Sequence, residues 1–226
     1  YKMKIKIDEL VRKNIRVLAP YSSSRDEYSG KEGFFLDANE NPFGIYNRYP
    51  DPYQPALKQK LAEIKNTNPE TIFIGNGSDE IIDLAFRVFC EPKQDKALTF
   101  IPTYGMYEVS ANINDVELIQ LPLNENFQIE KKDLEPYFLD DFLKLIFICS
   151  PNNPTGNLLK TEDIEFILEK FSGIVIIDEA YIDFTNQQTV SMLTMENKNL
   201  IVAKHSQKYT GWQVQELVMQ LVTPTP

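Results

Sequence analysis

The sequence has few cysteines, no long apolar run and no excess of positive charge, and each of these features argues against a class of protein. It has only two cysteines, Cys90 and Cys149, in 226 residues, so it is no disulfide framework. The apolar surroundings of both predict reduced, buried core thiols. No apolar run approaches the roughly 20 residues that a membrane-spanning helix needs. The net charge of −10 argues against nucleic acid or an anionic membrane as the partner.

What remains is the composition of an ordinary globular protein. Hydrophobic residues make up 42% and charged residues 25% of the chain, and its length allows one or two domains with a sizeable core. The first ten residues, YKMKIKIDEL, have no apolar centre of the kind that a secretory signal carries. We therefore expect a cytoplasmic protein.

Strand-sized apolar segments alternate with amphipathic segments along most of the chain. The expected strands are TIFIG, KALTFIPT, VELIQLPL, LKLIFICS, GIVIID and NLIVA. The expected helices are IDELVRKNI, PALKQKLAEIKN with Leu57, Leu61 and Ile64 on one face, SDEIIDLAFRVFC and KTEDIEFILEKF. This alternation predicts an α/β fold with a mainly parallel sheet covered by helices on both faces. We divide the chain into an arm (1–50), a core domain (51–203) and an atypical tail (204–226).

Two motifs directly follow the first two expected strands. In IGNGSDEI, residues 74–81, a glycine turn leads into a helix, whose free N–H groups suit a phosphate. The alternative is simple capping of this helix by Ser78. Tyr104 in FIPTYGMYE follows the next strand, and its ring either stacks on a flat cofactor or lies at the edge of the core.

Two further motifs follow later strands. In SPNNPTG, residues 150–156, the amides of Asn152 and Asn153 either donate to a ligand oxygen or belong to an ordinary turn. GIVIIDEAYIDF places Asp178 and Glu179 at the end of a buried strand, with Tyr181 three residues after Asp178. A dry carboxylate is costly unless it faces a cation. A protonated pyridine nitrogen is such a cation, and two unit charges ~4 Å apart attract by about 4 kcal/mol at an effective dielectric near 20.

These four motifs share one place in the expected fold. Open α/β sheets bind their ligands at the carboxyl ends of the strands, and each motif stands at such an end. A phosphate cradle, an aromatic platform, an amide and a buried carboxylate together indicate pyridoxal phosphate. That cofactor also needs a lysine that holds it as a Schiff base.

Six segments carry a resemblance to a known family. In this order, FLDANENPFG, YNRYPDPY, GNGSDEII, PTYGMYE, SPNNPTG and IIDEAYIDF resemble the histidinol-phosphate aminotransferases, from about Ile7 to Ala203. The resemblance implies the large domain of a fold-type I pyridoxal phosphate enzyme of histidine biosynthesis, working as a homodimer. It implies transfer of an amino group between glutamate and imidazole-acetol phosphate, giving histidinol phosphate and 2-oxoglutarate. A threonine-phosphate-type decarboxylase, an aromatic aminotransferase and a non-catalytic binding fragment remain as alternatives.

The resemblance also implies roles for individual residues. Those expected to hold the cofactor are Gly77, Ser78 and Asp79 at its phosphate, Tyr104 on its ring, Asn153 and Tyr181 at its phenolic oxygen, and Asp178 at its ring nitrogen. Tyr49 is expected to reach the cofactor phosphate of the neighbouring subunit, which is why a homodimer is implied. Tyr21 and Asn39 are expected near the substrate, and no metal is implied.

The tail departs from this family. After NLIVA the family is expected to continue as TFSKIYGLAGARVGYATGNP, with the Schiff-base lysine and a phosphate-binding arginine, and then with a small C-terminal domain. This chain reads KHSQKYTGWQVQELVMQLVTPTP instead. Lys208 stands at the count of the expected lysine, but its neighbours differ.

We hypothesise that a shift of reading frame accounts for the tail. Codons for the chain from Lys204 can be chosen, beginning AAA CAT TCT CAA AAA TAT, so that reading from the third base gives TFSKIYGLAGARVGYATGNP. Each shifted codon takes its last two bases from the first two of a visible codon, which the visible residue largely fixes. We therefore expect an out-of-frame tail from about Lys204, a truncated enzyme without its small domain, and little or no activity.

Overall fold

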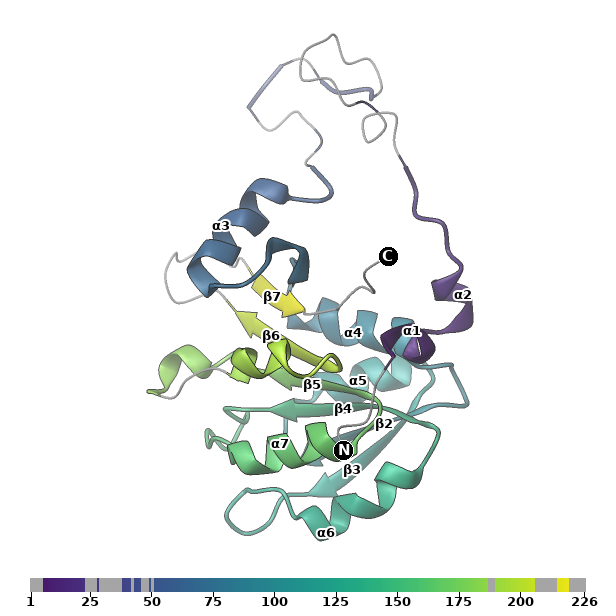
Figure 1. The fold of residues 1–226 in the computed structure, drawn as a ribbon, viewed down its shortest axis with the longest axis vertical. Helices are drawn as coiled ribbons and strands as arrows, with labels where there is room; N and C mark the ends of the chain where they lie inside the picture. Colours follow the sequence, from purple (N-terminus) through teal and green to yellow (C-terminus); the bar gives the residue numbers. More distant parts are fainter. Residues whose placement is uncertain are drawn as a thin grey trace.

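The computed structural model describes residues 6–22, 28, 38–41, 43–45, 49, 51–186, 190–205 and 215–219. Within them, seven strands form one sheet in the order β1-β7-β6-β5-β4-β2-β3 (Figure 1). The strands are β1 (Ile72–Phe73), β2 (Lys96–Ile101), β3 (Glu117–Pro122), β4 (Leu143–Cys149), β5 (Ile174–Asp178), β6 (Leu200–His205) and β7 (Gln215–Met219). Lys208 lies outside the described residues.

The sheet is mainly parallel, as the sequence predicts. β3, β2, β4, β5 and β6 pair with one another in parallel, whereas β7 runs antiparallel to both β6 and β1. All six expected strands are present. The sequence did not predict β7, because its five residues, QELVM, form a strand by pairing with two neighbours rather than by an apolar pattern of their own.

The helices agree with the prediction in part. The α-helices are α1 (Ile7–Leu10), α2 (Lys13–Arg16), α3 (Pro55–Lys65), α4 (Ser78–Phe89), α5 (Met106–Ile113), α6 (Lys131–Leu134) and α7 (Thr161–Lys170). The 3-10 helices are η1 (Pro69–Thr71), η2 (Glu135–Leu139), η3 (Ile182–Phe184) and η4 (Val190–Met195). The single helix expected in IDELVRKNI is wrong, because Val11 and Arg12 have extended ψ angles of 134° and 141° and separate α1 from α2.

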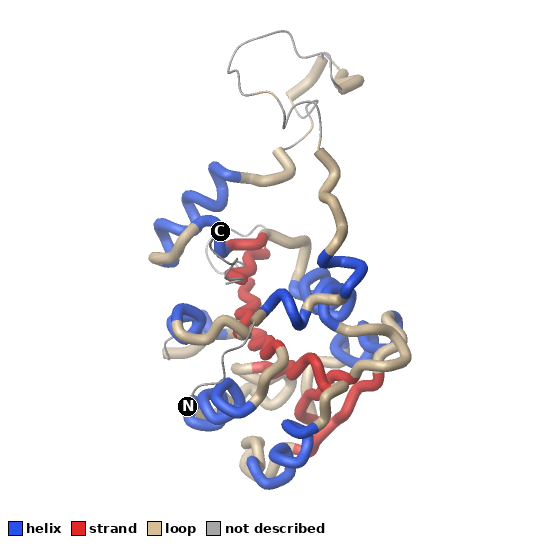
Figure 2. The backbone as a smooth tube through the Cα atoms, turned by 45° about the vertical axis from the view of Figure 1, so that its right-hand side comes forward, coloured by secondary structure: helices blue, strands red, loops and turns tan. Residues whose placement is uncertain are grey.

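Helices cover both faces of the sheet, as expected. On one face, α4 and α5 pack over residues such as Phe147 and Ile176, and the side chains of α1 join this cluster. On the other face, α6 and α7 pack over residues such as Ile146 and Ile177. Figure 2 shows the strands nearly edge-on between these layers. Alternate residues of each strand therefore enter different cores.

The helix α3 is amphipathic, but two apolar residues of one face are not covered by the residues that the structure describes. Leu57 and Ile64 are exposed, Ile64 at 64%, and Ala62 is the buried residue of this helix. Both cysteines are free and buried, as predicted. Among the described residues, no helix combines the length and the apolar character needed to cross a membrane.

Candidate active site

The carboxyl ends of β2, β4 and β5 lie side by side, because these strands are parallel neighbours in the sheet. The loops that follow them carry Tyr104, Asn153 and Tyr181, and Asp178 is the last residue of β5 itself. The first turn of α4 joins this group, since the hydroxyl of Tyr104 donates to Oδ1 of Asp79 at 3.1 Å. The structure therefore brings the motifs of four separate segments to one edge of the sheet.

Asp178 is the most deeply placed charge of this cluster. Its side chain is buried, with 4% of the residue exposed. Oδ1 accepts a hydrogen bond from the backbone N–H of Ala180 at 3.0 Å, and Oδ2 accepts one from the Tyr107 hydroxyl at 3.1 Å. Burial, and then the nearby charge of Asp178, raise the pKa of the Cys149 thiol to about 12. The carboxylate thus lies in a dry site where a cation is its natural complement.

Tyr104 stands at the rim of the same site. Its ring meets Tyr107 edge to face, with centroids 5.8 Å apart and an interplanar angle of 87°. Burial raises the pKa of Tyr104 to about 12, with further contributions from its bond to Asp79 and from the charges of Asp178 and Tyr181. Tyr104 therefore stays a neutral donor at physiological pH, with its ring held by two contacts.

The turn before α4 is built for the close approach of a ligand. Gly77 is the residue before the helix and has φ 110°, a conformation that side-chain-bearing residues rarely adopt. Having no side chain, it cannot cap the helix, and a first turn without a side-chain cap is a place that suits an anion. The Glu80 carboxylate accepts from the backbone N–H of Asn76 and fixes the turn from within. Ser78 is buried, and Asp79 is exposed except for its bond to Tyr104.

The two asparagines of SPNNPTG have different surroundings. Asn152 is buried, and its side-chain amide donates to the Pro102 carbonyl at 2.8 Å and to the Thr155 hydroxyl at 2.7 Å, while its oxygen accepts from the Thr103 hydroxyl at 3.0 Å. It therefore ties the loop after β2 to the loop after β4 and has no N–H left to donate to a ligand. Asn153 is half-buried, and its side-chain amide has no hydrogen-bond partner among the described residues.

Asp178 and Glu179 point to opposite faces of the sheet. Glu179 is 1% exposed and lies 3.5 Å from the ammonium of Lys204, whose side chain is 7% exposed. Its other oxygen accepts from the backbone N–H of Val190 at 2.7 Å. Of the two carboxylates at the end of this strand, only Asp178 belongs to the candidate site.

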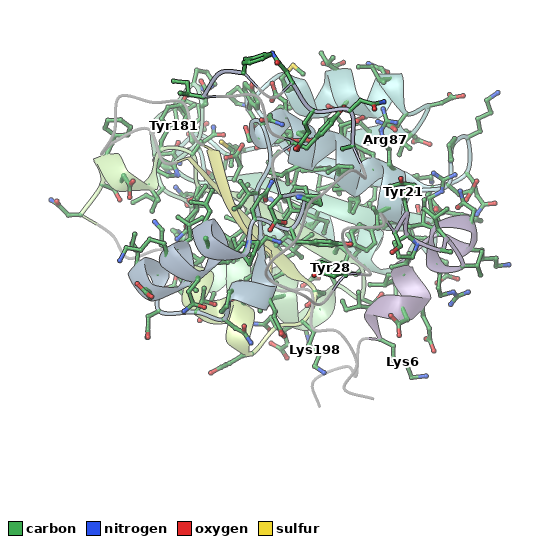
Figure 3. All side chains as sticks on the ribbon, turned by 90° about the horizontal axis from the view of Figure 1, so that it is seen from above. Lys6, Tyr21, Tyr28, Arg87, Tyr181 and Lys198 are labelled. Atoms are coloured by element: carbon green, nitrogen blue, oxygen red, sulfur yellow. The ribbon has the colours of Figure 1, made fainter. Side chains whose placement is uncertain are left out.

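Tyr181 lies at the same edge of the sheet, since it follows β5 and acts on the pKa of Tyr104, and it is 46% exposed. The predicted site residues of the arm, Tyr21, Asn39 and Tyr49, are exposed. Figure 3 places Tyr21 and Tyr181 on different sides of the molecule. Among the described residues, no hydrogen bond joins the arm residues to the cluster, so their roles stay predictions.

Tyr107 is a site residue that the sequence did not single out. It stands three residues after Tyr104 in the same motif, one helical turn further on, and that spacing was the available signal. Its hydroxyl reaches Asp178 because α5 packs against the sheet, and the sequence did not predict α5.

Known sequences resemble this chain closely. Residues 31–205 match the family described as aminotransferase class I and II. The histidinol-phosphate aminotransferase of Cytophaga hutchinsonii is 49% identical over 214 residues, and that of Bacteroides thetaiotaomicron is 51% identical over 207 residues. These matches cover 92% and 91% of this chain but 61% and 60% of the relatives. The chain thus spans about three fifths of the length of the relatives it matches.

Solved structures agree in fold. The histidinol-phosphate aminotransferase of Clostridium acetobutylicum has a TM-score of 0.64 at 25% identity, covering 78% of this chain and 52% of that one. The L-threonine-O-3-phosphate decarboxylase of Porphyromonas gingivalis has a TM-score of 0.62 at 24% identity, covering 77% and 52%. Cystalysin from Treponema denticola, whose structure contains pyridoxal 5'-phosphate, has a TM-score of 0.63 at 18% identity, covering 74% and 46%. On the extent of the family match and the identity of its relatives, this chain belongs to the aminotransferase class I and II family.

Proposed function

We propose that this chain derives from a histidinol-phosphate aminotransferase that uses pyridoxal 5'-phosphate. One observation carries the chemical part of the proposal: the buried Asp178 carboxylate, hydrogen-bonded by two donors, at the edge of the sheet where four motifs meet. The substrate class follows from relatives of that name at about half identity. The reaction is transfer of an amino group between glutamate and imidazole-acetol phosphate, a step of histidine biosynthesis.

The residues at the site fit this cofactor. Asp178 would stabilise a protonated ring nitrogen, and the N–H groups at the start of α4, which lack a side-chain cap, would bind the phosphate. Tyr104 would lie against the ring, and Asn153 and Tyr181 would bind the phenolic oxygen. When bound, the cofactor supplies the electron sink that amino-group transfer requires. The backbone of Gly77, Ser78 and Asp79 forms the phosphate cradle.

The proposal includes a cytoplasmic homodimer. The exposed apolar side chains of α3, Leu57 and Ile64, form an uncovered face, and Tyr49 and Tyr53 are exposed next to it in sequence. A second copy of the chain would cover this face. In that dimer, Tyr49 reaches the cofactor phosphate of the partner, and Tyr21 and Asn39 approach the substrate.

We further propose that the tail is read out of frame, starting just after Lys204. The buried ion pair of Lys204 with Glu179 supports a native lysine at this position, since a buried lysine needs a partner. With codons chosen to give the shifted reading described above, one added adenine after the Lys204 codon restores TFSKIYGLAGARVGY from position 205. The segment ARVGY then falls on positions 215–219, which are the residues of β7. The family match ends at residue 205, next to the proposed slip.

Two experiments test these proposals. Sequencing the gene settles the frame, and codons that give no TFSK reading in the shifted frame exclude the slip. The chain and its frame-repaired form are then assayed with histidinol phosphate and 2-oxoglutarate. We expect turnover by the repaired form, little or none by this chain, and no cofactor fixed onto Lys208 by borohydride. Release of CO₂ from threonine phosphate by the repaired form would favour a decarboxylase instead.

A further inference from the structure

Asp178 receives a second donor from a helix that the proposed mechanism does not use. The Tyr107 hydroxyl of α5 lies 3.1 Å from Oδ2 of Asp178, and both side chains are buried. Oδ1 is occupied by the backbone N–H of Ala180 at 3.0 Å. The backbone donor fixes one end of the carboxylate, and a side-chain donor from a separate element fixes the other.

The ring of Tyr107 holds this hydroxyl in place. It stacks on Phe147 of β4, with centroids 5.1 Å apart and an interplanar angle of 21°, and meets Tyr104 edge to face. Burial, followed by the charge of Asp178, raises the pKa of Tyr107 well above its usual value. The phenol therefore stays neutral and offers a proton to an acceptor throughout the physiological range.

A hydrogen bond to a charged acceptor in a dry site has a defined effect on that acceptor. It favours the ionised carboxylate over the protonated one, and this preference is worth roughly a 10- to 100-fold factor in an equilibrium. If the proton shared by Asp178 and a ring nitrogen moves to the nitrogen, the carboxylate bears the charge that the Tyr107 hydroxyl stabilises.

We propose that Tyr107 is a positioning residue, which orients Asp178 and keeps it ionised so that a pyridine nitrogen bound at the site is protonated. The inference rests on the proposed function, since it needs a pyridine ring at Asp178. Tyr107 itself does not touch the ring; it acts through the carboxylate. Its substitution therefore changes recognition of the ring nitrogen and leaves recognition of the rest of the ligand intact.

The test uses two ligands that need no Schiff-base lysine. Calorimetric titration of the purified chain compares 4'-deoxypyridoxine 5'-phosphate with its 1-deaza analogue, in which CH replaces the ring nitrogen. We expect the chain to prefer the nitrogen ligand and Tyr107→Phe to reduce this preference about tenfold or more. Affinity for the deaza ligand stays within about twofold, because that ligand offers no proton to Asp178. Tyr137→Phe, which removes the hydroxyl of a partly buried tyrosine on the other face of the sheet, is the matched control and changes neither affinity.

Each outcome has one meaning. If Tyr107→Phe weakens both ligands equally, or neither, Tyr107 has only a packing role and the inference is wrong. If the unaltered chain binds neither ligand, the proposed cofactor site fails, and the inference fails with it. Should Tyr107→Phe not fold by circular dichroism, 4-aminophenylalanine at this position restores a donor, and the inference then requires that the wild-type preference persists.

Discussion

The buried ion pair between Glu179 and Lys204 gives the sharpest test of how the end of the sheet is held together. Both side chains are almost fully buried, and their charged atoms lie 3.5 Å apart. At an effective dielectric near 20, this separation corresponds to an attraction of about 5 kcal/mol. Removing one partner of a buried pair leaves the other charge uncompensated, which costs roughly 3–5 kcal/mol. We expect Glu179→Gln to cause such a loss.

The choice of glutamine isolates the charge. The side-chain oxygen of glutamine still accepts from the N–H of Val190, which Glu179 does at 2.7 Å, so that bond is retained. In a chain of this length each kcal/mol shifts the melting temperature by about 2–4 °C, so a fall of roughly 10 °C is expected. Combining Glu179→Gln with Lys204→Met removes both charges, and the double variant is more stable than either single variant.

An exposed pair supplies the control for this measurement. Lys60 and Glu63 on α3 are closer, at 3.0 Å, but their side chains are 70% and 54% exposed. Glu63→Gln is expected to leave the stability almost unchanged, because solvent screens the pair. Urea titrations of all variants give the free energies of unfolding. Equal losses from Glu179→Gln and Glu63→Gln, or additive losses in the double variant, would show that burial gives the Glu179–Lys204 pair no special weight.

Three further predictions concern other parts of the chain. Arg12→Ala removes the two bonds to Glu91, at 3.1 and 3.2 Å, that fasten α2 to the end of α4, so limited proteolysis will cut the first 22 residues faster; unchanged cleavage would contradict this. Gly77→Ala places a side chain at φ 110°, which lowers the free energy of unfolding by about 1–3 kcal/mol and weakens binding of pyridoxine phosphate. Its control is Gly105→Ala, which leaves binding unchanged because no atom lies within 4 Å of the added carbon. The pKa of Cys149 is raised from 9.0 to about 12, so the native thiol stays protonated and a disulfide reagent at pH 8 labels it only after denaturation. Because the raised pKa makes ionisation easier in the unfolded chain, stability falls as pH rises from about 9 towards 12; a flat profile there would show that the thiol is accessible.

The sequence predicts the core of the fold because its signals are local. The apolar runs ending at Cys149 and Asp178 are too hydrophobic for a surface strand, and the structure confirms both as central parallel strands. The helix α4 was equally clear, since its apolar residues recur at helical spacing. Weak segments were missed: α5 and β7 depend on packing against neighbours that periodicity does not reveal.

Site residues followed the same division. Asp178 could be predicted from its place at the end of an apolar strand, because a buried carboxylate is costly unless a cation faces it. Asn152 and Asn153 could not be told apart in the sequence, and only the folded loops show that Asn152 is used up in joining them. Two contacts join residues that are far apart in sequence. Tyr107 and Asp178 are 71 positions apart, and Glu179 and Lys204 are 25 positions apart. No local sequence pattern predicts such pairs.

The arrangement of Asp178 and Glu179 shows why the end of β5 cannot tolerate a shift of register. Side chains alternate along a strand, so Asp178 continues the row of Ile174 and Ile176 towards α4 and α5, and Glu179 continues the other row. A slip of one residue would place Glu179 beside Tyr107 and leave Lys204 facing Asp178 or no carboxylate at all. The Glu179–Lys204 pair can form in one register only. It therefore holds the end of β5 in that register and keeps Asp178 at the ligand edge of the sheet.

The lysine that completes an aminotransferase site would come from the segment after β6. The Asp178 carboxylate is positioned by residues that precede that segment. We therefore expect the ring-nitrogen half of the site to survive in this chain whatever the reading frame of the tail.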